Sequence, residues 1–125
     1  MKFSTEINIL NNLRIHTIVG KLDIDQLLKN LSKIYSLPEY DSQMNSLWDL
    51  READVSSFST IEIYKLQEFV KKYWATNDSK RSALVVSSDV AFGLSRMYES
   101  LIELKTKIDI EIFRNYNKAI EWIRS

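Results

Sequence analysis

The chain has 125 residues, of which 45% are hydrophobic and 27% are charged, a length and composition that suit a single domain over residues 1–125. Seventeen basic residues balance seventeen acidic ones, so no net charge recruits nucleic acid or an anionic membrane. The absence of cysteine excludes disulfides, thiolate metal sites and cysteine nucleophiles. With no apolar signal core at the N-terminus and no apolar run near the roughly 20 residues of a membrane span, we expect a cytoplasmic protein that binds neither nucleic acid nor membranes.

The first two predicted elements are strands. Hydrophobic residues alternate with mostly polar ones over residues 3–9 and again over 13–19, and a period of two marks half-buried strands. Asn11 and Asn12 lie between them, and asparagine tolerates the positive φ of a tight hairpin turn. Gly20 is expected to end the second strand.

Helix and strand then alternate to the end of the chain. Helical spacing of apolar residues predicts helices from Ile24 to Tyr35 after an N-cap at Asp23, from Ile63 to Tyr73 after a cap at Ser59 or Thr60, from Leu94 to Leu104 after Ser88 or Asp89, and from Tyr116 to Ile123. The third helix is expected to bury Leu94, Met97, Tyr98, Leu101 and Leu104. Strands are predicted over residues 46–50, 83–86 and 108–112.

The resulting order, ββαβαβαβα, indicates a single α/β domain with a mixed sheet of about five strands flanked by about four helices. Crossovers between parallel strands are right-handed, and the first strand is expected at or near an edge. Ligands and partners meet the carboxyl ends of parallel strands. We therefore expect the functional surface at residues 51–59, 87–93 and 114–117.

This element order resembles the STAS domain (sulfate transporter and anti-sigma-factor antagonist) and its SEC14/STAS-like relatives. Residues 47–51, Leu-Trp-Asp-Leu-Arg, read like the STAS strand that ends in an Asp-Leu pair. Residues 91–98 and the late segment from Phe113 to Ile123 are similar to segments of small bacterial STAS-like proteins. The resemblance implies a non-enzymatic, cytoplasmic regulatory or protein-interaction module, with an unidentified protein partner and no cofactor.

In STAS regulators, a Ser or Thr at the start of the helix after that strand is phosphorylated by a partner kinase. The resemblance therefore implies regulatory phosphorylation at Ser59 or Thr60, with Ser57 in the preceding loop. The family motif reads close to Asp-Ser-Ser-Gly, whereas this chain has Val55 between the acidic residue and the serines and Phe58 in place of the glycine.

The same serines have an ordinary structural interpretation. Glu62 follows Ser59 by three residues, which is the spacing of a capping box. A phosphate before a helix is stabilised by the free backbone N–H groups and the helix dipole. Capping and regulation therefore both remain open for this segment.

The alternative function is binding of a small anionic or lipid-like ligand. Arginine binds carboxylates and phosphates through two parallel hydrogen bonds, and a neighbouring aromatic ring supplies an apolar wall. The candidate residues are Arg51, Ser87, Ser88, Phe92 and Arg96, with Arg114 near the same edge. The other interpretation is that these arginines are solvated or structural, with Arg96 paired to Asp49 or Asp89.

No residue pattern carries a catalytic or metal signature. Asp49, inside an apolar strand, is a candidate acid or base, but a structural role that satisfies loop N–H groups is favoured. His16 is the only histidine and is expected to be exposed or paired across the strands; one histidine without cysteine makes no convincing zinc site. We predict no catalytic residue and no metal ligand. Exposed alternation in the first and last strands leaves an edge-to-edge homodimer open.

Overall fold

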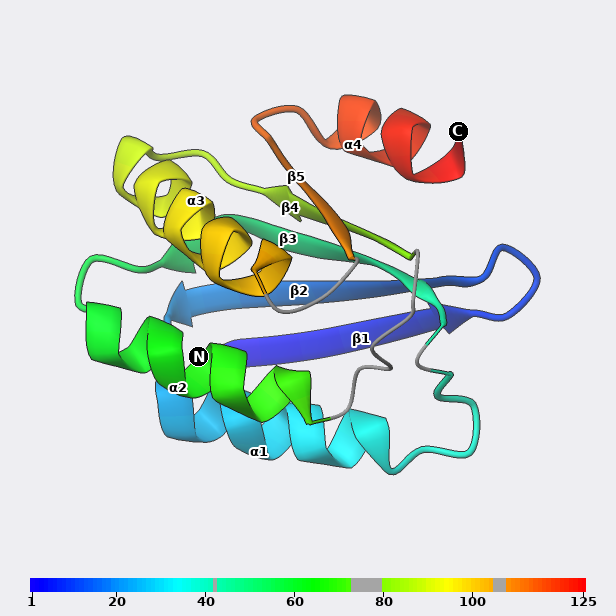
Figure 1. Cartoon of the computed structure of the whole chain (residues 1–125), viewed down its shortest axis with the longest axis horizontal. Coiled ribbons are helices and arrows are strands. Elements are labelled where there is room, and N and C mark those ends of the chain that lie inside the picture. Colours follow the sequence, from blue (N-terminus) through cyan, green and yellow to red (C-terminus); the bar gives the residue numbers. More distant parts are fainter. Residues whose placement is uncertain (42, 73–79, 105–107) are drawn as a thin grey trace.

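The computed structural model describes residues 1–41, 43–72, 80–104 and 108–125 (Figure 1). The strands are β1 (Lys2–Asn8), β2 (Leu13–Lys21), β3 (Asn45–Asp54), β4 (Arg81–Val85) and β5 (Asp109–Phe113), and the helices are α1 (Ile24–Tyr35), α2 (Thr60–Lys71), α3 (Asp89–Glu103) and α4 (Tyr116–Arg124). In these described residues the element order is the predicted one. The α/β class is therefore confirmed. None of the described helices has the length and apolar character needed to cross a bilayer.

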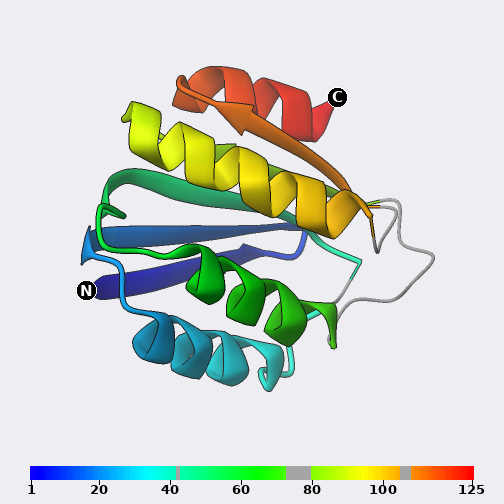
Figure 2. The same ribbon diagram turned by 60° about the vertical axis from the view of Figure 1, so that its left-hand side comes forward.

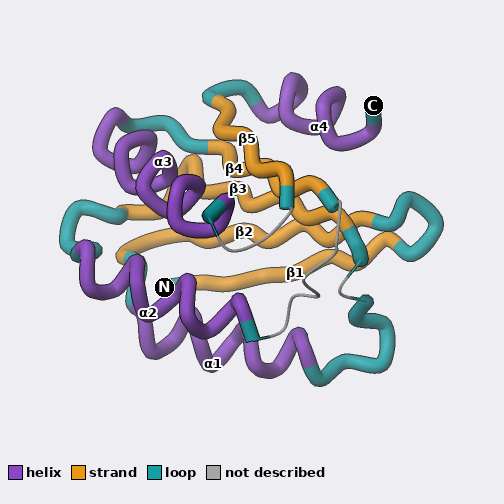
Figure 3. The backbone as a smooth tube through the Cα atoms, viewed as in Figure 1, coloured by secondary structure: helices purple, strands orange, loops and turns teal. Residues whose placement is uncertain are grey.

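The strands form one sheet in the order β1-β2-β3-β4-β5. β1 pairs with β2 antiparallel, and the remaining pairs are parallel. Asn12 has a φ of 52°, which closes the hairpin between β1 and β2 as predicted. Figure 3 shows that β2, β3, β4 and β5 end at the same edge of the sheet, where the loops before α1, α2, α3 and α4 begin.

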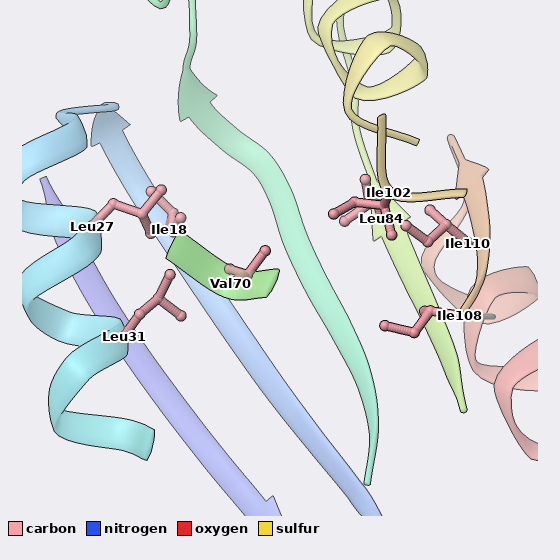
Figure 4. Close-up of a cluster of buried hydrophobic side chains, with 8 residues drawn as sticks. All are labelled: Ile18, Leu27, Leu31, Val70, Leu84, Ile102, Ile108 and Ile110. Atoms are coloured by element: carbon pink, nitrogen blue, oxygen red, sulfur yellow. The ribbon is translucent and has the colours of Figure 1, made fainter. Parts of the chain in front are cut away.

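Helices cover both faces of the sheet. Figure 2 shows α1, α2 and α3 side by side along one face. Their core with the sheet contains Ile18, Leu27, Leu31, Val70, Leu84, Ile102, Ile108 and Ile110 (Figure 4). On the opposite face α4 packs on the centre of the sheet, with buried Leu13, Leu47, Ala83, Val85, Ala119 and Ile123. Each fully buried aliphatic side chain contributes about 1.5–3 kcal/mol relative to exposure.

β3 is longer than predicted and carries a bulge. The prediction ended this strand at Leu50, but it continues to Asp54 because β2 also continues past Gly20 and supplies backbone partners. Thr17 pairs with Asp49 and Val19 pairs with Glu52, so β3 has one extra residue there. Part of the predicted loop from residue 51 onward is therefore strand.

The buried face of α3 differs in part from the predicted stripe. Met97 and Leu104 are exposed, whereas Ala91, Ser95 and Ile102 are buried. Small side chains on this face let the helix lie close to its neighbours. Apolar spacing alone does not reveal this, because a serine reads as a polar position.

His16 is fully buried, so its predicted exposure is wrong, whereas its predicted cross-strand pairing is confirmed. Thr5 lies opposite His16 in the register, and the Thr5 Oγ1–His16 Nδ1 distance is 2.9 Å. The imidazole also packs on Trp48 with 4.3 Å between ring centroids. Helices pack on both faces of β2. Polar residues that alternate with apolar ones along this strand, such as His16, are therefore buried too.

Candidate functional site

The loop between β3 and α2 is held by two inward-facing apolar side chains. Val55 and Phe58 are buried, and the Phe58 backbone N–H donates to the Val55 carbonyl at 3.0 Å. Asp54 Oδ1 accepts hydrogen bonds from the backbone N–H of Ser56 at 3.0 Å and from its hydroxyl at 2.6 Å. The two residues that differ from the STAS phosphorylation motif are therefore the anchors of this loop, and Ser56 and Ser57 are turned outward.

Ser59 and Glu62 form a reciprocal capping box. The Ser59 hydroxyl accepts from the Glu62 backbone N–H at 3.2 Å, and the Glu62 carboxylate accepts from the Ser59 backbone N–H at 2.8 Å. The predicted cap is thus confirmed. A phosphate on Ser59 would remove this hydroxyl from the cap and place two anions side by side.

Ser57 and Thr60 are exposed beside the cap. Within the described part of the chain, the hydroxyls of these two residues make no hydrogen bond. Of the predicted phosphorylation sites, these two can be modified without breaking a contact. Whether any of Ser57, Ser59 and Thr60 is phosphorylated stays a prediction.

Arg51 binds Asp49 through two parallel hydrogen bonds on the face covered by α4. Arg51 Nε lies 2.8 Å from Asp49 Oδ1, and Arg51 Nη2 lies 2.8 Å from Oδ2. The Arg51 guanidinium also lies 4.8 Å over the Tyr116 ring. The hydrogen bonds from Arg51 lower the pKa of Asp49, and Asp49 in turn raises the pKa of Arg51. Asp49 is therefore an ionised structural carboxylate.

The remaining residues of the predicted anion site also have structural partners. The Ser87 hydroxyl donates to the Arg51 carbonyl at 2.8 Å, and the Ser88 hydroxyl caps α3 by accepting from the backbone N–H of Ala91. Arg96 pairs with Glu99 at 3.6 Å, and not with Asp49 or Asp89.

Arg114 and Phe92 form a second cluster at this edge. Arg114 lies 2.7 Å from Asp89 and its guanidinium stacks 4.9 Å over the Phe92 ring. The structure thus brings Ser87 to Arg51 and Arg114 to Phe92. Binding of an anion at Arg51, Ser87, Ser88, Phe92 and Arg96 stays a prediction.

An apolar cavity of about 80 Å³ lies between the sheet and α2 and α3. Its walls come from β2, α1, β3, the loop after β3, α2, β4 and α3, and they include Trp48, Leu50, Val55, Phe58, Ile63, Val70, Leu84, Leu94, Ser95 and Tyr98. Trp48 and Leu50 face this cavity, whereas Asp49 and Arg51, which flank Leu50, lie on the α4 face. The cavity and the predicted arginine site are therefore on opposite faces of β3.

Comparison with solved structures places the fold. A crystal structure of an uncharacterised protein from the DUF3478 family with a SpoIIAA-like fold, from Shewanella loihica PV-4, matches 98% of this chain and 92% of that chain, with 19% sequence identity and a TM-score of 0.63. The chain has a SpoIIAA-like fold. At this identity the likeness shows the fold alone. No family model and no curated protein matches the chain.

The SpoIIAA-like fold confirms the STAS-like resemblance at the level of architecture. The cavity beneath its α2 and α3 was missed by the sequence interpretation. The available signals were Val55 and Phe58 in an otherwise polar loop, together with the small residues Ala91 and Ser95 on the buried face of α3. Trp74, for which the sequence favours a core position and leaves an exposed contact as the alternative, lies outside the described residues. Among the described residues, no three histidine, aspartate or glutamate side chains come together as metal ligands.

Proposed function

We propose that the chain is a non-enzymatic regulatory module that binds a protein partner. The binding surface, here named the partner face, consists of Ser57, Thr60, Ile61, Tyr64 and Val90. The observation that carries the proposal is the exposure of large apolar side chains there: Ile61 is 68% exposed, Tyr64 51% and Val90 56%. α2 and α3 are packed neighbours that start at the same sheet edge (Figure 3). Exposed apolar groups on adjoining helices are typical of protein-binding surfaces.

Several acidic residues lie close to the partner face along the chain. Glu52 and Asp54 are exposed at the end of β3, and Glu62 lies in the first turn of α2. Hydrogen bonds from Ser56 lower the pKa of Asp54, which keeps this carboxylate charged. Exposed Lys65 lies one turn after Ile61 on α2, and Lys21 lies near Asp54, so the charges around this surface have both signs. We therefore expect apolar contacts, and not net charge, to select the partner.

Phosphorylation would switch the partner face off. The exposed hydroxyls of Ser57 and Thr60 lie within it, and a phosphate adds about −1.5 to −2 charge. The N-terminus of α2 stabilises such a group. When a partner covers this apolar surface, the phosphate must lose its bound water, which costs free energy. The phosphate is also repelled by the carboxylates of Asp54 and Glu62. We expect Thr60→Glu to weaken partner binding.

Site-specific photo-crosslinking in native cells tests the proposal. A photoreactive phenylalanine analogue replaces Ile61, and a matched control carries it at Glu121 on α4, which is also exposed. We expect a protein adduct at position 61 that is absent at 121 and is lost when Val90→Asp is added. An equal pattern at both positions, or an adduct at 61 that survives Val90→Asp, would contradict the partner face.

A further inference from the structure

The outer side of α3 carries a regular series of exposed residues. They follow one another at alternating spacings of three and four positions, and they are Val90, Gly93, Met97, Ser100 and Leu104. This spacing places residues in one line along a helix, as in the seam of a coiled coil. Leu104, which caps the helix, is 79% exposed, Val90 56% and Met97 37%. This line of residues is here named the α3 seam, and no element of the described chain covers it.

Large and small side chains alternate along the α3 seam. Its first, third and fifth residues are large, whereas Gly93 and Ser100 between them are small. A Cβ added at Gly93 would meet no atom of the described residues within 4 Å beyond its own helical turns, so the space above it is open. The Ser100 hydroxyl donates to the Arg96 carbonyl at 3.1 Å, so covering Ser100 leaves no donor unpaired. The α3 seam therefore suits close contact with a helix whose large side chains lie over these two positions.

A second copy of α3 supplies such a helix. Two copies can run antiparallel with Met97 of each opposite Ser100 of the other. Leu104 of each then lies opposite Gly93 of the other, and a twofold axis repeats both contacts. Two parallel copies would instead place Gly93 against Gly93 and leave a gap between the helices. The alternation of sizes therefore favours the antiparallel pair.

The charges beside the α3 seam select the same register. Arg96 and Glu103 flank the seam on one side, and both are exposed. Arg96 lies 3.6 Å from Glu99 of its own helix, a long contact that leaves 63% of the arginine side chain exposed. In the antiparallel register above, Arg96 of each copy faces Glu103 of the other. A shift by one heptad brings either Arg96 against Arg96 and Asp89 against Glu103, or Glu103 against Glu103, and like charges disfavour both shifts.

The opposite flank of the α3 seam is apolar. Leu94 and Leu101 lie there half-buried, and the same register places Leu94 of each copy beside Leu101 of the other. We propose that the chain forms an antiparallel homodimer through the α3 seam. Two helices of this length bury less than the roughly 1,200 Å² typical of stable interfaces, so we expect a weak, reversible dimer. The overlap covers residues 93–104 and leaves out Val90, so the inference goes beyond the partner face and does not rest on it.

Sedimentation equilibrium of the purified native chain at about 10 µM to 1 mM tests the dimer without any variant. We expect a monomer at the low end of this range and a dimer that dominates at the high end. A chain that is still monomeric at about 1 mM, or that forms larger assemblies in place of a dimer, would overturn the inference. The outcome is independent of the partner face, because the crosslinking at Ile61 detects a different protein.

Charge reversal tests the register. Arg96→Glu and Glu103→Arg should each weaken dimerisation about tenfold or more, because each brings like charges together at two places. An equal mixture of the two variants should associate at least as tightly as the native chain, since opposite charges face each other in the mixed pair. Lys118→Glu, the same reversal at an exposed position of α4, is the matched control and should dimerise as the native chain does. Single variants that dimerise like the native chain, or a mixture that stays monomeric, would overturn the inference.

Gly93→Leu separates the interface from the fold. The open space above Gly93 accommodates the new side chain in the monomer, and replacing a glycine inside a helix favours the helix. Thermal unfolding at about 10 µM, where the chain is expected to be monomeric, should therefore show a variant at least as stable as the native chain. Its dimer should be about tenfold weaker or more, because the new side chain occupies the place of Leu104 of the second copy. Native-like dimerisation of this variant would contradict the proposed pairing.

Discussion

Asp49 and Arg51 hold each other on one side of β3 through two hydrogen bonds of 2.8 Å, although the bulge in this strand follows directly after Asp49. The pair fixes the strand end from which the loop to α2 departs. Asp49 is mostly buried and Arg51 is about half-exposed, so solvent weakens the interaction. We expect Asp49→Asn to destabilise the fold by about 1 kcal/mol in urea unfolding at pH 7.

Unfolding measured at several pH values tests whether Asp49 stabilises the fold through its negative charge. The folded-state pKa of Asp49 is lowered, so its contribution is present above the unfolded-state pKa and is lost as the pH falls through the folded-state value. The difference in unfolding free energy between native chain and Asp49→Asn should therefore shrink below about pH 4. A difference that stays constant down to pH 2 would contradict an ionised pair.

His16 should make the fold sensitive to mild acid. Its pKa is lowered to about 3, so the unfolded chain binds a proton between about pH 6.5 and 3 that the folded chain does not. The contribution of His16 to the free energy of unfolding is fully present above about pH 6.5 and decreases as the pH falls toward 3. We expect a loss of about 2 kcal/mol between pH 7 and pH 5 in urea unfolding. His16→Gln, which cannot titrate, should lack this slope; the same slope in that variant would refute the assignment.

The capping box of α2 should contribute measurably to stability. Ser59→Ala removes the hydroxyl that accepts from Glu62, and a lost N-cap costs about 1 kcal/mol. Ser57→Ala, in the same loop and without a hydrogen bond from its hydroxyl within the described residues, is the control and should change the free energy of unfolding by less than about 0.5 kcal/mol. Equal effects of the two substitutions would argue against the cap.

Phe58 should be the main anchor of the loop after β3. It is buried and forms part of the cavity wall. Phe58→Ala removes most of this contact, and we expect a loss of about 3 kcal/mol in thermal or urea unfolding. Phe58→Gly, which restores the STAS motif residue, should be at least as destabilising. If Phe58→Gly left stability unchanged, the loop would be held by other contacts.

Local sequence patterns predicted most of the secondary structure. Period-two alternation predicted β1 and β2, and helical spacing predicted the helices. Asp23 was predicted as a cap, and Ser59 and Ser88 were each one of two candidate caps, because capping side chains act on backbone groups only three residues away. Their success follows from the short range of these interactions. The end of β3 was predicted wrongly, because its last residues are held by backbone pairing with β2, a contact distant in sequence.

The site was less accessible to prediction for the same reason. The sequence interpretation gathered arginines at the carboxyl edge, but pairing of Arg51 with Asp49 and of Arg114 with Asp89 depends on which face each side chain occupies. It also left the buried Arg14 of β2 unremarked, since a polar residue in an alternating strand reads as solvent-facing.

The sequence by itself therefore determined the order of elements and the positions of their caps, because these follow from periodicity and from interactions between near neighbours. The STAS-like architecture was implied by the resemblance of residues 47–51, 91–98 and the late segment to that family. Only the tertiary structure decided which faces are covered. Packing of α1, α2 and α3 on one side and α4 on the other buries both faces of β2, and this placed Arg14 and His16 inside the fold. Burial is a property of what packs on a strand, and no pattern within the strand specifies it.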